Sequence, residues 1–192
     1  MNNKIDYLRV SVTNKCNLKC IYCHPLDDEA LCKSQCIMKL DEILHIIRLF
    51  VKCGIKKVRL TGGEPLLRND IVQLVNKLSS AEGIEDLSIT TNGVRLESLA
   101  EGLKSAGLQR INISVDSLNR DVYKAITGSD LLNNVQRGID KALQVGFNPV
   151  KINCVIVKGV NSSREEIIPL AGMSVDLPVM VRFIEYYPTS KD

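Results

Sequence analysis

The sequence carries little net charge and has no long apolar run. Its 25 Lys and Arg residues nearly balance 22 Asp and Glu residues, leaving a formal charge of +3. So small a charge gives no electrostatic reason to expect nucleic-acid or anionic-membrane binding, and any anion specificity has to come from where the cations are placed. No apolar run reaches the roughly 20 residues that span a bilayer, and the N-terminus lacks the apolar core of a secretory signal. We therefore expect a cytoplasmic chain with no nucleic-acid or membrane partner.

Low-complexity stretches and linker-like segments are also missing, which gives no reason to divide the chain. Its 192 residues, 45% of them hydrophobic, suffice to bury one substantial core. The prediction is a single domain covering 1–192.

Hydrophobic periodicity switches repeatedly between two residues and 3.6 residues. The two-residue period predicts strands at 7–13, 56–61, 85–91, 109–116, 149–157 and 179–185. The longer period predicts helices at 40–53, 69–80, 95–106, 131–145 and 163–172, the last interrupted by Pro169. Strands that alternate with helices are typical of an α/β fold with a parallel sheet and right-handed crossovers.

Each predicted strand has an apolar side, which suits a helix layer, and a polar side. Arg9, Arg59, Lys151 and Arg182 all fall on the polar side. Because a closed eight-stranded barrel fills its interior with branched apolar side chains, six strands with a polar side predict an incomplete, TIM-like (β/α)6 barrel whose lumen holds a ligand. Clustered cations there favour a polyanion such as a phosphate chain. The alternative is a sheet face open to solvent, with ordinary surface charges.

Three of the seven cysteines, Cys16, Cys20 and Cys23, lie within the eight residues CNLKCIYC. In a reducing compartment, clustered cysteines are more typical of metal or redox sites than of disulfides. Four thiolates would saturate a 4Fe-4S cluster, whereas three leave one iron with an open position, as a catalytic zinc site keeps a position for water or substrate.

Two other interpretations of the cysteines remain open. Zinc could bind the three thiolates together with Cys32, Cys36 or His24, or the thiols could be reduced and metal-free. Cys53 and Cys154 are expected to be packing or incidental residues.

Further motifs accompany the cysteines: VRLTGGEPLLR (58–68), ITTNG (89–93), INISVDS (111–117) and VRFIEYYP (181–188). Together with CNLKCIYC they resemble the radical S-adenosylmethionine (radical SAM) superfamily and, within it, the GTP 3′,8-cyclases of molybdenum cofactor biosynthesis. The resemblance runs from about residue 5 to residue 189, and it implies the incomplete barrel of the radical SAM core.

The resemblance implies that Cys16, Cys20 and Cys23 are the catalytic and metal-binding residues. They would bind three irons of one 4Fe-4S cluster, leaving the fourth for the amino and carboxylate groups of S-adenosyl-L-methionine. Gly62 and Gly63, which have no Cβ, would let the methionyl amine approach the backbone. Without the three cysteines TGGEP would indicate a plain turn, and with them the cosubstrate contact is the better interpretation. By motif position the cosubstrate contacts are Tyr22, Gly62, Gly63, Glu64, Ser114 and Tyr187.

The family's GTP contacts correspond to Arg9, Arg59, Thr90 and Lys151, all on the polar side of the predicted strands. Asp116 and Asn112 are further candidates for orienting the ribose, and both could instead be internal hydrogen-bond partners.

The implied reaction is that of an iron-sulfur lyase. A reductant of the flavodoxin or ferredoxin type supplies an electron, S-adenosylmethionine is cleaved reductively, and the 5′-deoxyadenosyl radical removes the C3′ hydrogen of GTP to start cyclisation at C8. Two alternatives are the same radical chemistry on another substrate and a truncated, non-catalytic module that only holds a cluster or zinc.

The sequence departs from the family at three places. His24-Pro25 replaces Met-Pro after the third cysteine, and Tyr187 replaces a methionine that contacts the cosubstrate. The family's C-terminal region, which binds a second cluster, has no counterpart in this sequence, so we do not expect a complete reaction from this chain alone. Three alternatives remain open: the chain is a fragment or a short paralogue, a C-terminal partner polypeptide supplies the missing part, or the substrate differs.

Overall fold

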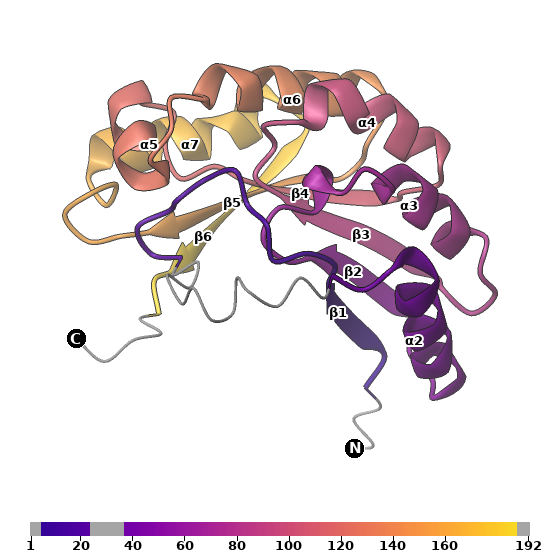
Figure 1. The fold of residues 1–192 in the computed structure, drawn as a ribbon. Helices are drawn as coiled ribbons and strands as arrows, with labels where there is room; N and C mark the ends of the chain where they lie inside the picture. The colour runs from indigo at the N-terminus through magenta and orange to yellow at the C-terminus, as the bar shows by residue number, and fades with distance from the viewer. Residues whose placement is uncertain (1–4, 24–36, 188–192) are drawn as a thin grey trace.

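The computed structural model describes residues 5–23 and 37–187. Six parallel strands form one sheet in the order β1-β2-β3-β4-β5-β6 (Figure 1). Their bounds are Tyr7–Ser11 (β1), Lys57–Thr61 (β2), Asp86–Thr91 (β3), Arg110–Ser114 (β4), Val150–Ile156 (β5) and Val179–Glu185 (β6). Among the described strands β1 and β6 each pair with one neighbour, so the barrel is incomplete, as predicted.

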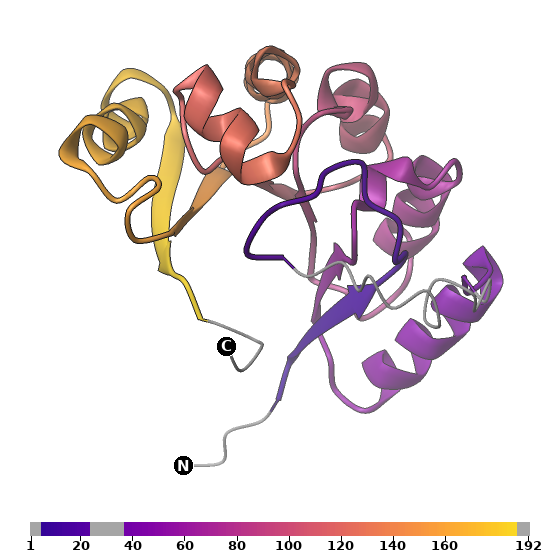
Figure 2. The ribbon, with the colours of Figure 1, turned by 60° about the vertical axis from the view of Figure 1, so that its left-hand side comes forward.

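The described helices lie along the outer side of the curved sheet (Figure 2). They are α2 (Leu40–Lys52), α3 (Ile71–Ser79), α4 (Leu96–Ser105), α5 (Arg120–Thr127), α6 (Leu132–Gln144) and α7 (Arg164–Asp176), with a 3-10 turn η1 at Pro65–Leu67. No helix in the described ranges is long and apolar enough to cross a membrane.

All six predicted strands and all five predicted helices are confirmed, with ends that shift by a few residues. The prediction missed α5, which is short and turns only a few large residues, such as Tyr123 and Ile126, toward the core. It also ended α7 too early. Pro169 lies on the exposed side of that helix, where the carbonyl that it leaves unpaired can face water, so the helix continues to Asp176.

The apolar sides of the strands form the core against the helices. Leu60, Ile89, Ile111 and Ile152 are each 0% exposed, as expected for residues between a sheet and a helix layer. The alternation of the sequence puts Phe183 of β6 on the apolar side as well, but Phe183 is 41% exposed, because it lies toward the end of this edge strand, where the burial decreases.

The register aligns the polar residues in rows across the opposite, open face. Arg9 pairs with Arg59, Arg59 with Ser88, and Ser88 with Arg110. The next rows bring together Thr90, Asn112 and Lys151, and then Ser114, Asn153 and Arg182. The sheet thus collects side chains that are far apart in sequence on one surface.

Candidate cluster and substrate site

The cysteines lie on a loop that leaves the carboxyl end of the edge strand β1 and runs to α5, the helix that follows β4 (Figure 1). Two backbone hydrogen bonds fix its far part: Lys19 N donates to Thr127 O and Ile21 N donates to Ile126 O, both at 2.9 Å. The side chain of Leu18, in the same loop, is buried. The loop, which we call the cluster loop (residues 12–23), therefore spans strands that are not neighbours.

The three thiols of the cluster loop are close enough to influence one another. Burial raises the pKa of Cys20 to about 12, and the charges of Asp116, Cys23 and Cys16 contribute in that order. Burial and then Cys16 raise the pKa of Cys23. Within the described ranges, however, no three His, Cys, Asp or Glu side chains are arranged to hold a single metal ion. His24, Cys32 and Cys36, which the zinc interpretation needs, lie outside the described residues.

The TGGEP segment packs directly against the cluster loop. Gly63 N donates to Thr13 O and Glu64 N donates to Lys15 O, both at 2.7 Å. A Cβ added to Gly62 or Gly63 would lie 2.3 Å from Thr13 O or Lys15 O, respectively, and Gly62 also has φ +135°. The glycines are thus required by the approach of the loop backbone, a reason that the sequence analysis did not foresee.

The buried Glu64 carboxylate links the TGGEP segment to the loop that follows β3. It is 1% exposed and accepts hydrogen bonds from Leu66 N (2.9 Å), Thr91 Oγ1 (2.7 Å) and Asn92 N (2.7 Å). Burial raises its pKa, and these hydrogen bonds oppose the rise. Asn92 Nδ2 also donates to Asn17 Oδ1 of the cluster loop at 2.8 Å. The side chain of Glu64 therefore organises the loops.

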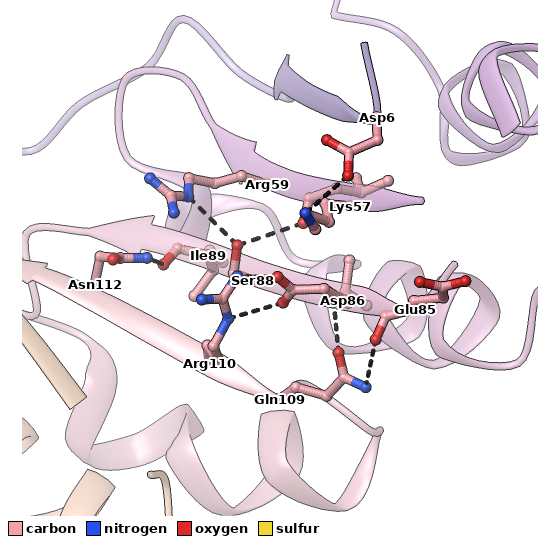
Figure 3. Close-up of polar contacts among 12 residues, drawn as sticks. Asp6, Lys57, Arg59, Glu85, Asp86, Ser88, Ile89, Gln109, Arg110 and Asn112 are labelled. Carbon is pink, nitrogen blue, oxygen red and sulfur yellow. Dashed lines mark hydrogen bonds and ion pairs between the residues drawn. The ribbon is translucent and has the colours of Figure 1, made fainter. Parts of the chain in front are cut away.

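The cations predicted for the lumen do share the open face. Arg59 donates to Ser88 Oγ at 3.3 Å (Figure 3). Its guanidinium carbon also lies 5.3 Å from the centroid of the Tyr7 ring. Burial lowers the pKa of Arg59; Tyr7 opposes this shift, and the charges of Arg9, Arg110 and Arg182 add to it.

Lys151 experiences the same crowding of positive charge. Burial, followed by Arg182, Arg110 and Arg59, lowers its pKa. No described carboxylate lies within salt-bridge distance of Arg9, Arg59, Lys151 or Arg182. The open face is therefore a concentration of positive charge that an anion would stabilise.

The scan against protein families matches the model described as "Radical SAM superfamily" over residues 10–171. The chain belongs to the radical SAM superfamily. It is 49% identical over 183 residues to "GTP 3′,8-cyclase" of Listeria monocytogenes, covering 95% of this chain and 54% of that protein. It is 46% identical over 183 residues to "Molybdenum cofactor biosynthesis protein 1" of Homo sapiens, covering 95% of this chain and 28% of that protein.

A solved structure shares the fold of this chain at low sequence identity. The S-adenosylmethionine-bound form of SuiB from Streptococcus suis aligns with a TM-score of 0.82 and 22% identity, covering 96% of this chain and 41% of that one. That likeness supports the incomplete barrel. The chain spans about half the length of the curated GTP 3′,8-cyclases that it matches.

The remaining predicted contacts of the radical SAM site are spread along the carboxyl ends of the strands. Thr90 and Ser114 are half-buried at the ends of β3 and β4, and Tyr22 is half-buried in the cluster loop. Tyr187 follows β6 and is 85% exposed. Cys154 packs in the core, as expected, and Cys53 is exposed at the end of α2.

Sequence reasoning missed two features of the open face. Arg110 lies in the row of Arg59 and makes a bidentate ion pair with Asp86 (Figure 3). The strand alternation that placed Asn112 on the polar side would have placed Arg110 there too. The second feature is a pair of buried amide oxygens, Asn112 Oδ1 and Asn153 Oδ1, which have no hydrogen-bond partner among the described residues. Such acceptors suit a ligand that brings hydroxyl or N–H donors.

Proposed function

We propose that this chain is the single-domain core of a radical SAM enzyme of the GTP 3′,8-cyclase type, acting in molybdenum cofactor biosynthesis. The observation that carries the proposal is that a three-cysteine loop crosses the carboxyl ends of strands whose open face gathers Arg59, Lys151 and Arg182, cations that have no salt-bridge partner among the described residues. The high identity to GTP 3′,8-cyclases over 95% of the chain supports the choice of substrate.

Cys16, Cys20 and Cys23 are the proposed ligands of a 4Fe-4S cluster. A single tetrahedral zinc with Zn–S bonds of about 2.3 Å needs its thiolates roughly 4 Å apart, whereas cluster thiolates each bind a different iron. Three cysteines on one short loop can each bind a different iron and leave the fourth iron open, and the match to the radical SAM superfamily supports a cluster. When bound, the cluster supplies the electron that cleaves S-adenosylmethionine to the 5′-deoxyadenosyl radical.

The chain's own residues would orient the cosubstrate at the rim of the barrel. Tyr22, Gly63, Ser114 and Tyr187 are the proposed contacts, and Gly62 gives the backbone its turn. Because the Glu64 carboxylate is engaged by three protein donors, it would act by fixing the loop.

The triphosphate of GTP is the proposed anion on the open face. Arg9, Arg59 and Lys151 would neutralise it, because their mutual repulsion is relieved when an anion binds. Thr90 would add a hydroxyl contact. The unpartnered oxygens of Asn112 and Asn153 would accept hydrogen bonds from the bound nucleosides.

Complete cyclisation also needs partners. We include a reductant of the flavodoxin or ferredoxin type and a C-terminal region like that of the relatives, of which this chain covers 54% to 56%. Met180 and Ile184 on the edge strand β6 are 47% and 42% exposed, and an added segment could cover them.

The test is anaerobic reconstitution with iron and sulfide, followed by reduction with S-adenosylmethionine, with and without GTP. Chromatography of 5′-deoxyadenosine should show product, and GTP should raise its amount. Cys20→Ala should abolish both the cluster and the product. A cluster that yields no 5′-deoxyadenosine would favour the non-catalytic module, and product unaffected by GTP would favour another substrate.

A further inference from the structure

Asp116, just beyond β4, is bound to the cluster loop across the sheet. Asp116 is only 3% exposed. Both oxygens of its carboxylate accept hydrogen bonds. Tyr22 OH donates to Oδ2 at 2.5 Å, and Val155 N donates to Oδ1 at 2.8 Å. Tyr22 lies between Cys20 and Cys23, so the contact joins the second half of the cysteine motif to β4 and β5.

Asp116 is itself held in place by the turn before α7. Asn161, 1% exposed, donates from Nδ2 to Asp116 O at 2.7 Å and to Val155 O at 2.9 Å. Its Oδ1 accepts from Val157 N at 2.7 Å. These hydrogen bonds fix the backbone around Asp116, so its carboxylate is already positioned to accept from the Tyr22 hydroxyl.

We infer that Asp116 is a positioning residue that fixes Tyr22 and thereby the Cys20–Cys23 half of the cluster loop before metal binds. The inference rests on the proposed function, because it assigns these cysteines to a cluster. The loop is fastened at two ends: the amides of Gly63 and Glu64 hold Thr13 and Lys15, and the Tyr22 contact and α5 hold the far part.

A ribose-orienting role for Asp116 does not fit this geometry. Both carboxylate oxygens already serve protein donors, so a ligand hydroxyl would compete with Tyr22 or Val155. The chemistry also explains why a carboxylate stands here. An ionised aspartate accepts on both oxygens, whereas an asparagine amide could accept only from Val155 N and would have to donate to the Tyr22 hydroxyl, which replaces the charge-assisted hydrogen bond with a neutral one of opposite direction.

The test uses the metal-free chain first, with Tyr22→Phe, Asp116→Asn and the double variant. The amides of Lys19 and Ile21, which donate to Thr127 and Ile126, report the closure of the loop through hydrogen exchange. Loss of a hydrogen bond to a charged group should speed their exchange about tenfold in either single variant. The double variant should add little, since both changes remove the same charge-assisted hydrogen bond between Tyr22 and Asp116.

Tyr123→Phe is the matched control. Tyr123 is also a buried tyrosine, 1% exposed, and its hydroxyl has no partner among the described residues. This variant should leave the exchange of Lys19 and Ile21 unchanged. In reconstituted protein, Tyr22→Phe should slow cluster uptake and broaden the electron paramagnetic resonance (EPR) signal of the reduced cluster, whereas Tyr123→Phe should do neither.

Wild-type exchange rates in folded Tyr22→Phe protein, checked by circular dichroism, would overturn the inference even if Asp116→Asn failed to fold. Failure of the proposed function looks different. In that case the exchange effects appear as described, but the wild-type chain takes up no cluster. Faster exchange with unaltered cluster uptake and an unaltered EPR signal would also overturn the inference, because the contact would then be merely structural.

Discussion

The two faces of the sheet differ although they are built from the same six strands. On the helix side, neighbouring strands contribute Leu60, Ile89 and Ile111, all fully buried. On the open side, the residues next to them in sequence include Arg59, which is half-buried among other cations. The helix side thus stabilises the fold. The open side keeps a repulsion between cations, which a bound anion would reduce. Adjacent residues of one strand should therefore differ sharply in what their removal does.

The largest effect on stability is expected on the helix side. Leu60→Ala should lower the free energy of unfolding by about 2–5 kcal/mol, because it leaves a cavity in the core. Arg59→Ala, one residue earlier, should change it by less than about 1 kcal/mol, since its contacts are partly exposed. Urea denaturation of both variants measures the difference. Equal losses would show that the two faces contribute alike to stability.

Glu64 tests the same comparison with a polar residue, because it is a buried acid just beyond the carboxyl end of β2. Glu64→Gln should lower the free energy of unfolding by roughly 1–3 kcal/mol, since an amide cannot accept from all three donors. Urea denaturation checks this value. Glu97→Gln, an exposed acid whose ion pair is with Arg137, is the control and should change stability little. A Glu64 variant as stable as the control would mean that water replaces the lost acceptor.

The open face should govern anion binding. Arg59→Ala and Lys151→Ala should each weaken GTP binding about tenfold, as expected for the loss of one charge-assisted hydrogen bond. Isothermal titration at two salt concentrations measures the affinity and its electrostatic part. Arg137→Ala removes a cation from the exposed helix layer and should leave the affinity unchanged. Similar losses in all three variants would indicate a general charge effect and not a site.

The smallest effect is expected at a pair that belongs to neither face. Asp70 accepts from Arg68 Nε at 2.8 Å and from a terminal guanidinium nitrogen at 2.7 Å, and the hydrogen bond with Arg68 lowers its pKa despite some burial. A lowered carboxyl pKa contributes stability above its ordinary value of 3.8, and this is lost as the pH falls through the lowered pKa. Asp70→Asn should cost about 1 kcal/mol at pH 7, and the gap from the wild type should shrink at pH 3. A gap that stays constant over this range would contradict the assigned cause.

Alternation in the sequence was enough to predict the strands, the helix side and the placement of Arg9, Arg59 and Lys151. It works because each strand separates its two faces locally. It could not predict contacts between distant segments, such as Tyr22 with Asp116, which are 94 residues apart. It also could not show that Gly62 and Gly63 admit the cluster loop, since that depends on how two loops meet in space.

The most direct test of the central claim is EPR spectroscopy of the reconstituted, reduced protein before and after S-adenosylmethionine is added. Three cysteine ligands leave one iron open, so we predict a 4Fe-4S signal whose shape changes when the cosubstrate binds. A signal that S-adenosylmethionine leaves unchanged, or no iron-sulfur signal at all, would contradict the account.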